Sequence, residues 1–276
     1  NYMLRRTDHS LIEQGGAPGA HDIRDGDRNA IARAITFAEQ ERFLELDLGA
    51  PDEKAPVVGI TGTGGAGKSS LTDEFLRRYL LDFPEDKVAV LCIDPTRRRS
   101  GGALLGDRIR MNSLRSEQTY MRSMATRETK GELASAIDEA VAITQHAGFD
   151  LIIVETSGIG QGDADIVDHC DQSIYVMTSE FGASSQLEKI DMLDLADHVV
   201  INKFEKAGSL DALRAVRKQV RRNRMLFDAE DEDLPVYATI ASQFGDTGVS
   251  ALYYDVVSDA RDEDFETNWD FSSKVS

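Results

Sequence analysis

An eight-residue run at positions 62–69, Gly-Thr-Gly-Gly-Ala-Gly-Lys-Ser, constrains the fold of this chain more than any other feature. It matches the pattern Gly-x-x-x-x-Gly-Lys-Ser of a phosphate-binding loop, in which backbone N–H groups and the positive end of a helix face the phosphates. A short apolar run, residues 55–60, precedes it, and Leu71, Phe75 and Tyr79 follow it at helical spacing. The sequence therefore predicts a buried strand, a glycine-rich turn and a helix N-terminus that together bind a nucleotide.

Each residue of this loop has an expected contact with the nucleotide. Lys68 is expected to reach the terminal phosphates and to take part in catalysis, and the Ser69 hydroxyl is expected to ligate Mg²⁺. The other loop residues are expected to bind the nucleotide mainly through backbone N–H groups. They are Gly62, Gly64, Gly65, Ala66, Gly67 and Ser70.

The chain beyond the loop alternates apolar runs with helical patterns. We expect strands at residues 88–93, 151–154, 173–177, 199–201 and 236–240. Continuous β-branched runs between helices are typical of a mostly parallel sheet that is covered by helices on both faces. The predicted fold class is therefore α/β, with the ligand bound at the carboxyl ends of the strands.

Composition suggests where the domain begins and ends. Residues 1–25 are polar and rich in glycine, and we expect a linker or lead-in there. Residues 26–258 are expected to form the nucleotide-binding domain, which begins with an amphipathic helix. Residues 259–276 are expected to form an acidic tail or linker. An excised domain of a longer protein is favoured over a free-standing protein, and both stay open.

Charge and cysteine content exclude several classes of function. The formal net charge of −18 would repel duplex phosphates, which argues against a nucleic-acid partner. No apolar run reaches the length of about 18 residues that a membrane-spanning helix needs, so no membrane contact is expected. Two cysteines far apart in the sequence fit a reducing, cytoplasmic location.

A second motif, Asn-Lys-Phe-Glu after the strand at 199–201, predicts which purine is bound. It has the form Asn-Lys-x-acid, in which a carboxylate accepts hydrogen bonds from the N1–H and the exocyclic amine of guanine. Adenine has no such pair of donors, so the expected nucleotide is GTP and the expected architecture is that of a P-loop GTPase. The motif comprises Asn202 as a brace between loops, Lys203 over the base, Phe204, and Glu205 as the acceptor. Residues 241–243 are expected to add a backbone contact to the base.

Oxygen ligands for Mg²⁺ are expected beside the phosphate loop, because this ion prefers oxygen donors in octahedral geometry and keeps several waters. Asp94 closes the strand at 88–93, Asp107 lies in the loop that follows, and Glu155 closes the strand at 151–154. A turn or a helix cap is an alternative role for Asp107. A carboxylate that closes a fully apolar strand beside a phosphate loop, as Glu155 does, has few other uses.

Three longer segments resemble the GTP-binding chaperones of cobalamin-dependent acyl-CoA mutases, and most of all the GTPase domain of the fused isobutyryl-CoA mutases. They are residues 59–70, 94–111 and 154–161, and the resemblance extends over about residues 25–258. It implies a GTPase that gates the delivery of adenosylcobalamin to the mutase and protects the mutase from inactivation. No histidine motif for cobalamin appears, so the cofactor is expected to be bound by the partner mutase.

The resemblance also implies roles for single residues. It assigns Mg²⁺ to Ser69, Asp94, Asp107, Glu155 and Thr156. It makes residues 94–111 a switch in which Arg110 meets phosphate. It makes residues 182–197 a second switch, in which Gln186 and Lys189 complete the GTPase site when the mutase is bound. Free-standing relatives carry a C-terminal dimerisation arm, whereas this chain ends in an acidic tail, which leaves a homodimer possible but open.

Phosphoryl transfer requires positioning and neutralisation of charge more than covalent chemistry. Lys68 and Mg²⁺ are expected to neutralise the γ-phosphate oxygens, and Glu155 to orient the metal shell or a water. Gln161 either positions the attacking water or is an ordinary loop residue. Intrinsic hydrolysis is expected to be slow and to accelerate when a partner orders the switches.

Three other functions share the phosphate loop and stay open at this point. An ATP-dependent kinase of the same sheet class would not need the Asn-Lys-Phe-Glu motif. A nickel-insertion metallochaperone GTPase would need a histidine- or cysteine-rich metal site, and five scattered histidines do not form one. A regulatory module that binds GTP with negligible turnover would differ only in its rate of hydrolysis.

Overall fold

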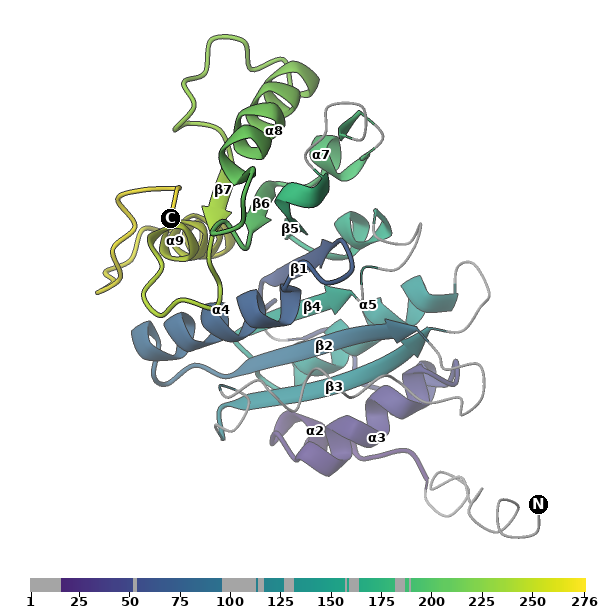
Figure 1. The fold of residues 1–276 in the computed structure, drawn as a ribbon. Helices are drawn as coiled ribbons and strands as arrows, with labels where there is room; N and C mark the ends of the chain where they lie inside the picture. The colour runs from purple at the N-terminus through teal and green to yellow at the C-terminus, as the bar shows by residue number, and fades with distance from the viewer. Residues whose placement is uncertain are drawn as a thin grey trace, which may run out of the picture.

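The computed structural model describes residues 16–51, 54–95, 113, 117–126, 132–156, 158, 164–181, 187–188 and 190–276. Its centre is a sheet in the order β3-β2-β4-β1-β5-β6-β7, and every strand pairing is parallel (Figure 1). The strands are β1 (Val57–Gly62), β2 (Val88–Pro95), β3 (Thr119–Thr126), β4 (Leu151–Thr156), β5 (Gln172–Met177), β6 (His198–Asn202) and β7 (Val236–Thr239). The predicted α/β fold with a parallel sheet is confirmed.

Helices cover both faces of this sheet (Figure 1). One face carries α4 (Lys68–Asp82) and α9 (Thr247–Arg261). The opposite face carries α2 (Ala20–Arg24), α3 (Arg28–Ala38), α5 (Glu132–His146), α7 (Met192–Leu195) and α8 (Ser209–Asn223). Short 3-10 turns are η1 (Phe43–Leu46), η5 (Asp165–His169) and η6 (Ser179–Phe181). None of the helices in the described part of the chain could cross a bilayer.

The central strands are apolar because they are buried from both sides. Every residue of β1 and β4 is buried. Val58 and Ile60 point toward α4 and α9, whereas Val57 belongs to the core under α3 and α5. Side chains alternate across a strand, so a strand with helices on both faces needs apolar residues at consecutive positions.

One strand, β3, was missed by the sequence analysis. It lies at the edge of the sheet and pairs only with β2 among the described strands. Tyr120 and Met124 are buried, but Arg122 donates to Thr36 Oγ1 on α3 at 2.9 Å and to Oε2 of Glu39, just after α3, at 2.8 Å. An edge strand is partly exposed and pairs on one side, so its sequence mixes polar and apolar residues and shows no continuous apolar run.

Segments that were expected to be linkers pack on the domain at both ends. In α2, Ile23 is fully buried in the core with α3. After α9, Phe265 and Trp269 pack against the core beneath α4 and α9, and Val275 forms a parallel bridge with Ala238 of β7. A few apolar residues, widely spaced among acidic ones, anchor this last segment. The region is polar on average, so its composition does not reveal these contacts. The domain boundaries at residues 25 and 258 stay predictions.

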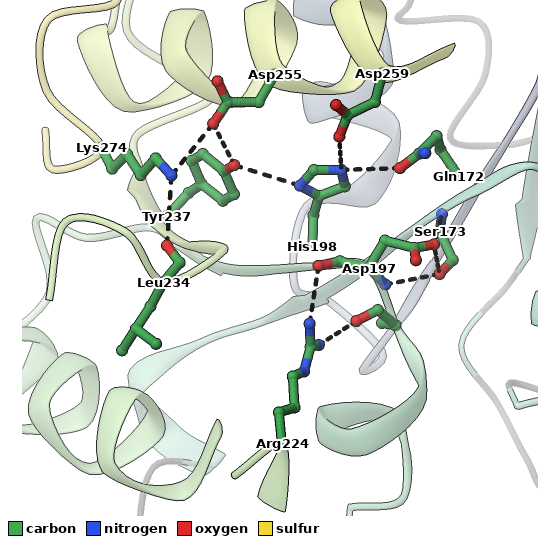
Figure 2. A network of polar contacts seen from close by, with 11 residues as sticks. Gln172, Ser173, Asp197, His198, Arg224, Leu234, Tyr237, Asp255, Asp259 and Lys274 are labelled. Carbon is green, nitrogen blue, oxygen red and sulfur yellow. Dashed lines mark hydrogen bonds and ion pairs between the residues drawn. The ribbon is translucent and has the colours of Figure 1, made fainter. Parts of the chain in front are cut away.

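A polar network fastens the end of the chain beside β5, β6 and β7 (Figure 2). Lys274 Nζ lies 3.3 Å from Asp255 Oδ2, and the Tyr237 hydroxyl donates to the same carboxylate at 2.5 Å. His198 is buried between the Tyr237 hydroxyl, 3.3 Å from Nδ1, and the side-chain oxygen of Gln172, 3.1 Å from Nε2. Burial lowers the pKa of His198 to about 4.

Candidate functional site

The phosphate loop lies between β1 and α4, as predicted. Gly65 and Gly67 have φ angles of 74° and 93°, a region that L side chains rarely adopt. A Cβ on Gly67 would lie 2.5 Å from Asn202 Nδ2, and a Cβ on Gly62 would lie 1.9 Å from a carbonyl oxygen of β5. The loop therefore needs glycine both to turn and to pack closely against its neighbours.

This loop is built to hold an anion. Gly67 caps α4 without a side-chain hydrogen bond, and the first turn of the helix contains no acidic residue. The N–H groups of that turn are then left for a ligand, and the helix dipole favours negative charge there. In addition, the buried Thr63 hydroxyl has no hydrogen-bond partner among the described residues. A buried polar atom of this kind usually marks a missing ligand or water.

The lysine of the loop is held beside the segment that follows β4. Lys68 is buried, and its Nζ donates to the carbonyl oxygens of Gly62 at 2.9 Å and of Thr63 at 3.1 Å. Gly158 has a φ of 71°, and a Cβ there would lie 2.3 Å from Lys68 Nζ. Gly158 was not among the predicted site residues. A glycine three residues after the strand-closing Glu155 was the available signal.

Glu155 connects the hydroxyl groups at the start of α4. Its Oε1 accepts a hydrogen bond from Ser69 Oγ at 2.6 Å, and its Oε2 accepts one from Thr72 Oγ1 at 2.8 Å. The carboxylate is buried. Its oxygens and the Ser69 hydroxyl are hard oxygen donors of the kind that Mg²⁺ prefers. These two side chains therefore fit one Mg²⁺ ion. Thr72 was missed because a threonine inside a helix has no distinctive sequence pattern.

The other predicted metal ligands and switch residues stay predictions. Thr156 Oγ1 lies 2.7 Å from Thr61 Oγ1, in a hydrogen bond between β4 and β1. Asp94 is the second-last residue of β2, where the structure describes only the backbone. Across the described ranges, no group of three or more His, Cys, Asp or Glu side chains could hold a metal ion. Five predicted site residues lie outside the described part of the chain: Asp107, Arg110, Gln161, Gln186 and Lys189.

Asn202 joins three segments of the site. Its Nδ2 donates to the carbonyl oxygen of Ala66 in the phosphate loop at 2.8 Å. Its Oδ1 accepts from the Ala241 N–H and from Thr239 Oγ1, each at 3.1 Å. One buried amide thus links the phosphate loop, the end of β6 and the loop after β7, because an amide can donate and accept at the same time.

The residues after Asn202 turn toward the phosphate loop. Lys203 has a φ of 59°, which is uncommon for a residue with a side chain, and its Nζ donates to the carbonyl oxygen of Gly65 at 2.8 Å. The Phe204 N–H donates to the carbonyl oxygen of Thr239 at 3.1 Å. Glu205 is exposed and makes no hydrogen bond or ion pair with the described residues, so its carboxylate is available to a ligand.

Comparison with known proteins places this site in a family. A sequence model described as methylmalonyl-CoA mutase-associated GTPase MeaB matches residues 31–263. The chain belongs to the MeaB family. It is 54% identical over 266 residues to the fused isobutyryl-CoA mutase of Geobacillus kaustophilus, and 57% identical over 262 residues to that of Cupriavidus metallidurans. Each match covers 92% of this chain and 24% of the relative, so the chain spans about a quarter of the length of these relatives.

Two solved structures share the fold of this chain. The LAO/AO transport system kinase superposes with a TM-score of 0.62 at 24% identity, over 87% of this chain and 73% of that chain. HypB from Helicobacter pylori in complex with nickel superposes with a TM-score of 0.50 at 14% identity, over 85% of this chain and 97% of that chain. At these identities the likeness concerns the fold alone. Membership of the MeaB family of GTPases implies that this site binds a guanine nucleotide with Mg²⁺.

Proposed function

We propose that this chain hydrolyses GTP and acts as a G-protein chaperone for a cobalamin-dependent acyl-CoA mutase of the isobutyryl-CoA type. In this role it gates the loading of adenosylcobalamin and protects the mutase from inactivation. The observation that carries the proposal is the hydrogen bonding of Asn202. Its amide holds the phosphate loop against the segment that carries the exposed carboxylate of Glu205. When the phosphates of a nucleotide occupy the loop, the Glu205 carboxylate would accept hydrogen bonds from its base, which favours guanine.

The hydrolytic role follows from the charges around the loop. When GTP binds, the Lys68 ammonium can exchange its two carbonyl acceptors for phosphate oxygens, because a charged acceptor makes the stronger hydrogen bond. Ser69 and Glu155 would hold Mg²⁺, which supplies positive charge to the phosphate oxygens when bound. The N-terminus of α4 adds its dipole to the same region. The site is therefore proposed to act by neutralising charge on the phosphate oxygens.

Slow intrinsic turnover is part of the proposal. The cationic side chain of the described phosphate loop is Lys68, so we infer that charge neutralisation depends on Lys68, Mg²⁺ and backbone N–H groups. Gln161, Gln186, Lys189 and Arg110 are proposed to complete the site when a mutase orders the switches. The mutase partner and its adenosylcobalamin are proposed because relatives that share 54% and 57% identity with this chain are fused isobutyryl-CoA mutases.

A comparison of nucleotide binding and single-turnover hydrolysis tests the proposal. Wild-type protein is expected to bind GTP far more tightly than ATP in calorimetry and to hydrolyse it slowly. The Lys68→Ala protein is expected to lose GTP binding. The control is Lys218→Ala, which replaces an exposed lysine of α8, and this protein is expected to bind GTP as the wild type does. Added mutase and cobalamin-binding domains are expected to accelerate hydrolysis. Equal binding of ATP and GTP would contradict the assigned nucleotide, and a rate unchanged by the mutase would contradict the chaperone role.

The nickel-insertion alternative gains no support from the structure. The likeness to HypB is one of fold at 14% identity, and the nickel in that structure belongs to HypB. The family match and the Asn202 geometry favour a guanine nucleotide over the ATP of the kinase alternative.

A further inference from the structure

A small aromatic and arginine cluster lies beside the loop that follows β7, residues 241–245. Trp269, the one tryptophan of the sequence, lies edge-on to Phe244 with ring centroids 6.1 Å apart and planes at 74°. The Arg77 guanidinium covers the Phe244 ring at 4.3 Å. Phe244 is 64% exposed, so these two neighbours contribute much of the packing that holds its side chain.

The other side of Trp269 rests on the helix that begins at the phosphate loop. The Arg78 guanidinium lies 4.8 Å from the centroid of the indole ring and is fully buried in α4. Arg78 donates to the backbone oxygen of Asp246 and to Ser250 Oγ, each at 3.3 Å, and pairs with Glu74 at 2.6 Å. Trp269 therefore connects α4 with the loop after β7.

The two ends of this loop are fixed by side-chain hydrogen bonds, whereas its middle has one backbone hydrogen bond, from the Gln243 N–H to the Ile240 carbonyl oxygen at 2.8 Å. At one end, the Ala241 N–H donates to Asn202 Oδ1, which ties it to the phosphate loop. At the other end, Asp246 caps α9 by accepting from the Val249 N–H at 2.8 Å. Between them Ser242 and Gln243 are exposed. The ring of Phe244 is then the side-chain contact that sets how closely the middle of the loop lies over its neighbours.

The docked position of Trp269 is itself finely balanced. Its backbone N–H donates to Thr267 Oγ1 at 3.3 Å, and Thr267 Oγ1 donates to Asp82 Oδ2 at the end of α4, at 2.7 Å. The indole N–H is buried and has no hydrogen-bond partner within the described ranges. A buried donor without an acceptor disfavours the docked position, which is stabilised by packing against the core and by the ring contacts with Arg78 and Phe244. Phe244 is therefore one of the contacts that hold the indole in place.

We propose that Trp269 is a positioning residue for guanine recognition: through Phe244 it holds loop 241–245 against the base and slows the release of guanine nucleotides. The proposal rests on the proposed function, because it takes the site to bind a guanine nucleotide next to Asn202 and Ala241. It adds the segment after α9 to the machinery that controls nucleotide exchange. Trp269 acts through the loop and does not touch the nucleotide.

Release of a fluorescent guanine nucleotide tests this role. With mant-GDP in a stopped-flow instrument, Trp269→Ala is expected to release nucleotide about two- to tenfold faster, the range of one lost aromatic pair. Trp269→Phe keeps an aromatic ring and is expected to restore most of the wild-type rate. Phe271→Ala is the matched control: Phe271 lies in the same segment but stacks on Tyr254, with centroids 4.1 Å apart.

Two further measurements separate positioning from general loosening of the fold. The double variant Phe244→Ala/Trp269→Ala is expected to release mant-GDP no faster than Phe244→Ala alone, since Trp269 acts through Phe244. Because the wild type contains a single tryptophan, its emission is expected to change on saturation with GDP and to stay unchanged with ATP.

The outcomes distinguish the two proposals. Release from Trp269→Ala at the wild-type rate, additive effects in the double variant, or tryptophan emission indifferent to bound GDP would each overturn the role of Trp269 while leaving GTP binding intact. Acceleration by Phe271→Ala equal to that by Trp269→Ala would also overturn it, because the effect would then belong to the whole segment. Failure of the wild type to bind mant-GDP would overturn the proposed function and this inference together.

Discussion

Lowering the pH from 7 to 5 is expected to destabilise this domain through His198, the first residue of β6. Burial lowers the pKa of His198 to about 4, against the opposing effect of Asp197 and Asp255. Asp259 Oδ2 lies 3.8 Å from Nε2, but its side chain is more than half exposed, so its attraction for a protonated imidazole is screened. The unfolded chain, with an ordinary histidine pKa of about 6.5, binds the proton first as the pH falls.

The magnitude follows from these two pKa values. Between about pH 6.5 and pH 4 the unfolded state binds more protons than the folded state, so the free energy of unfolding falls as the pH falls. The full difference corresponds to about 3 kcal/mol, and the part lost between pH 7 and pH 5 is about 2 kcal/mol. A loss of this size is a substantial fraction of the stability of a typical domain.

Urea unfolding followed by circular dichroism at pH 7, 6 and 5 measures this loss. His198→Gln cannot gain the proton, so its free energy of unfolding is expected to depend on pH less than that of the wild type, by about 2 kcal/mol over this interval. His21→Gln, which replaces an exposed histidine of α2, is the matched control and is expected to keep the wild-type dependence. Identical pH dependences for His198→Gln and the wild type would refute the reasoning.

Two substitutions test the base-binding side of the site. Asn202→Ala leaves the buried carbonyl oxygen of Ala66 and the N–H of Ala241 without their partner, so a loss of about 1–3 kcal/mol in the free energy of unfolding is expected in urea titrations, together with weaker GTP binding. Glu205→Asn exchanges an acceptor for a group that also donates, so nucleotide competition is expected to show weaker GTP binding and improved binding of xanthosine triphosphate. Exposed Glu232, between α8 and β7, is replaced by asparagine as the control for charge alone.

These two predictions fail in different ways. An Asn202→Ala protein with wild-type stability would show that water replaces the amide without cost. A Glu205→Asn protein that still prefers GTP to the same degree would show that another group selects the base, and the assignment of guanine recognition to this carboxylate would be wrong.

Structure could be predicted from sequence where one short segment carries its own physical constraint. The phosphate loop was predicted because closely spaced glycines, a lysine and a serine between an apolar run and a helical pattern suit few other structures. Strands β1, β2, β4, β5, β6 and β7 were predicted because burial on both faces makes their residues continuously apolar. Strand β3 was not predicted, because Arg122 and Ser123 interrupt its apolar residues at the exposed edge of the sheet.

The parts of the site that the sequence analysis missed depend on distance in space. Thr72 contacts Glu155 across 83 positions of sequence, and no local pattern marks either residue as the partner of the other. Position 158 must be glycine because a Cβ there would clash with Lys68 Nζ. Trp269 contacts Phe244 only because the segment after α9 folds back over α4. In each case the second residue of the contact is supplied by tertiary packing.

The amino-acid sequence by itself determined the class of this protein: a parallel α/β fold, a phosphate loop, and a guanine-type motif after a strand. These follow from spacing along the chain, which the covalent backbone keeps in any conformation. Only the tertiary structure decided which carboxylate meets the loop hydroxyls, how Asn202 ties three segments together, and that residues at the acidic end of the chain pack against the core. Those contacts join residues tens to hundreds of positions apart, and they exist only once the strands are ordered side by side and the helices are packed on both faces.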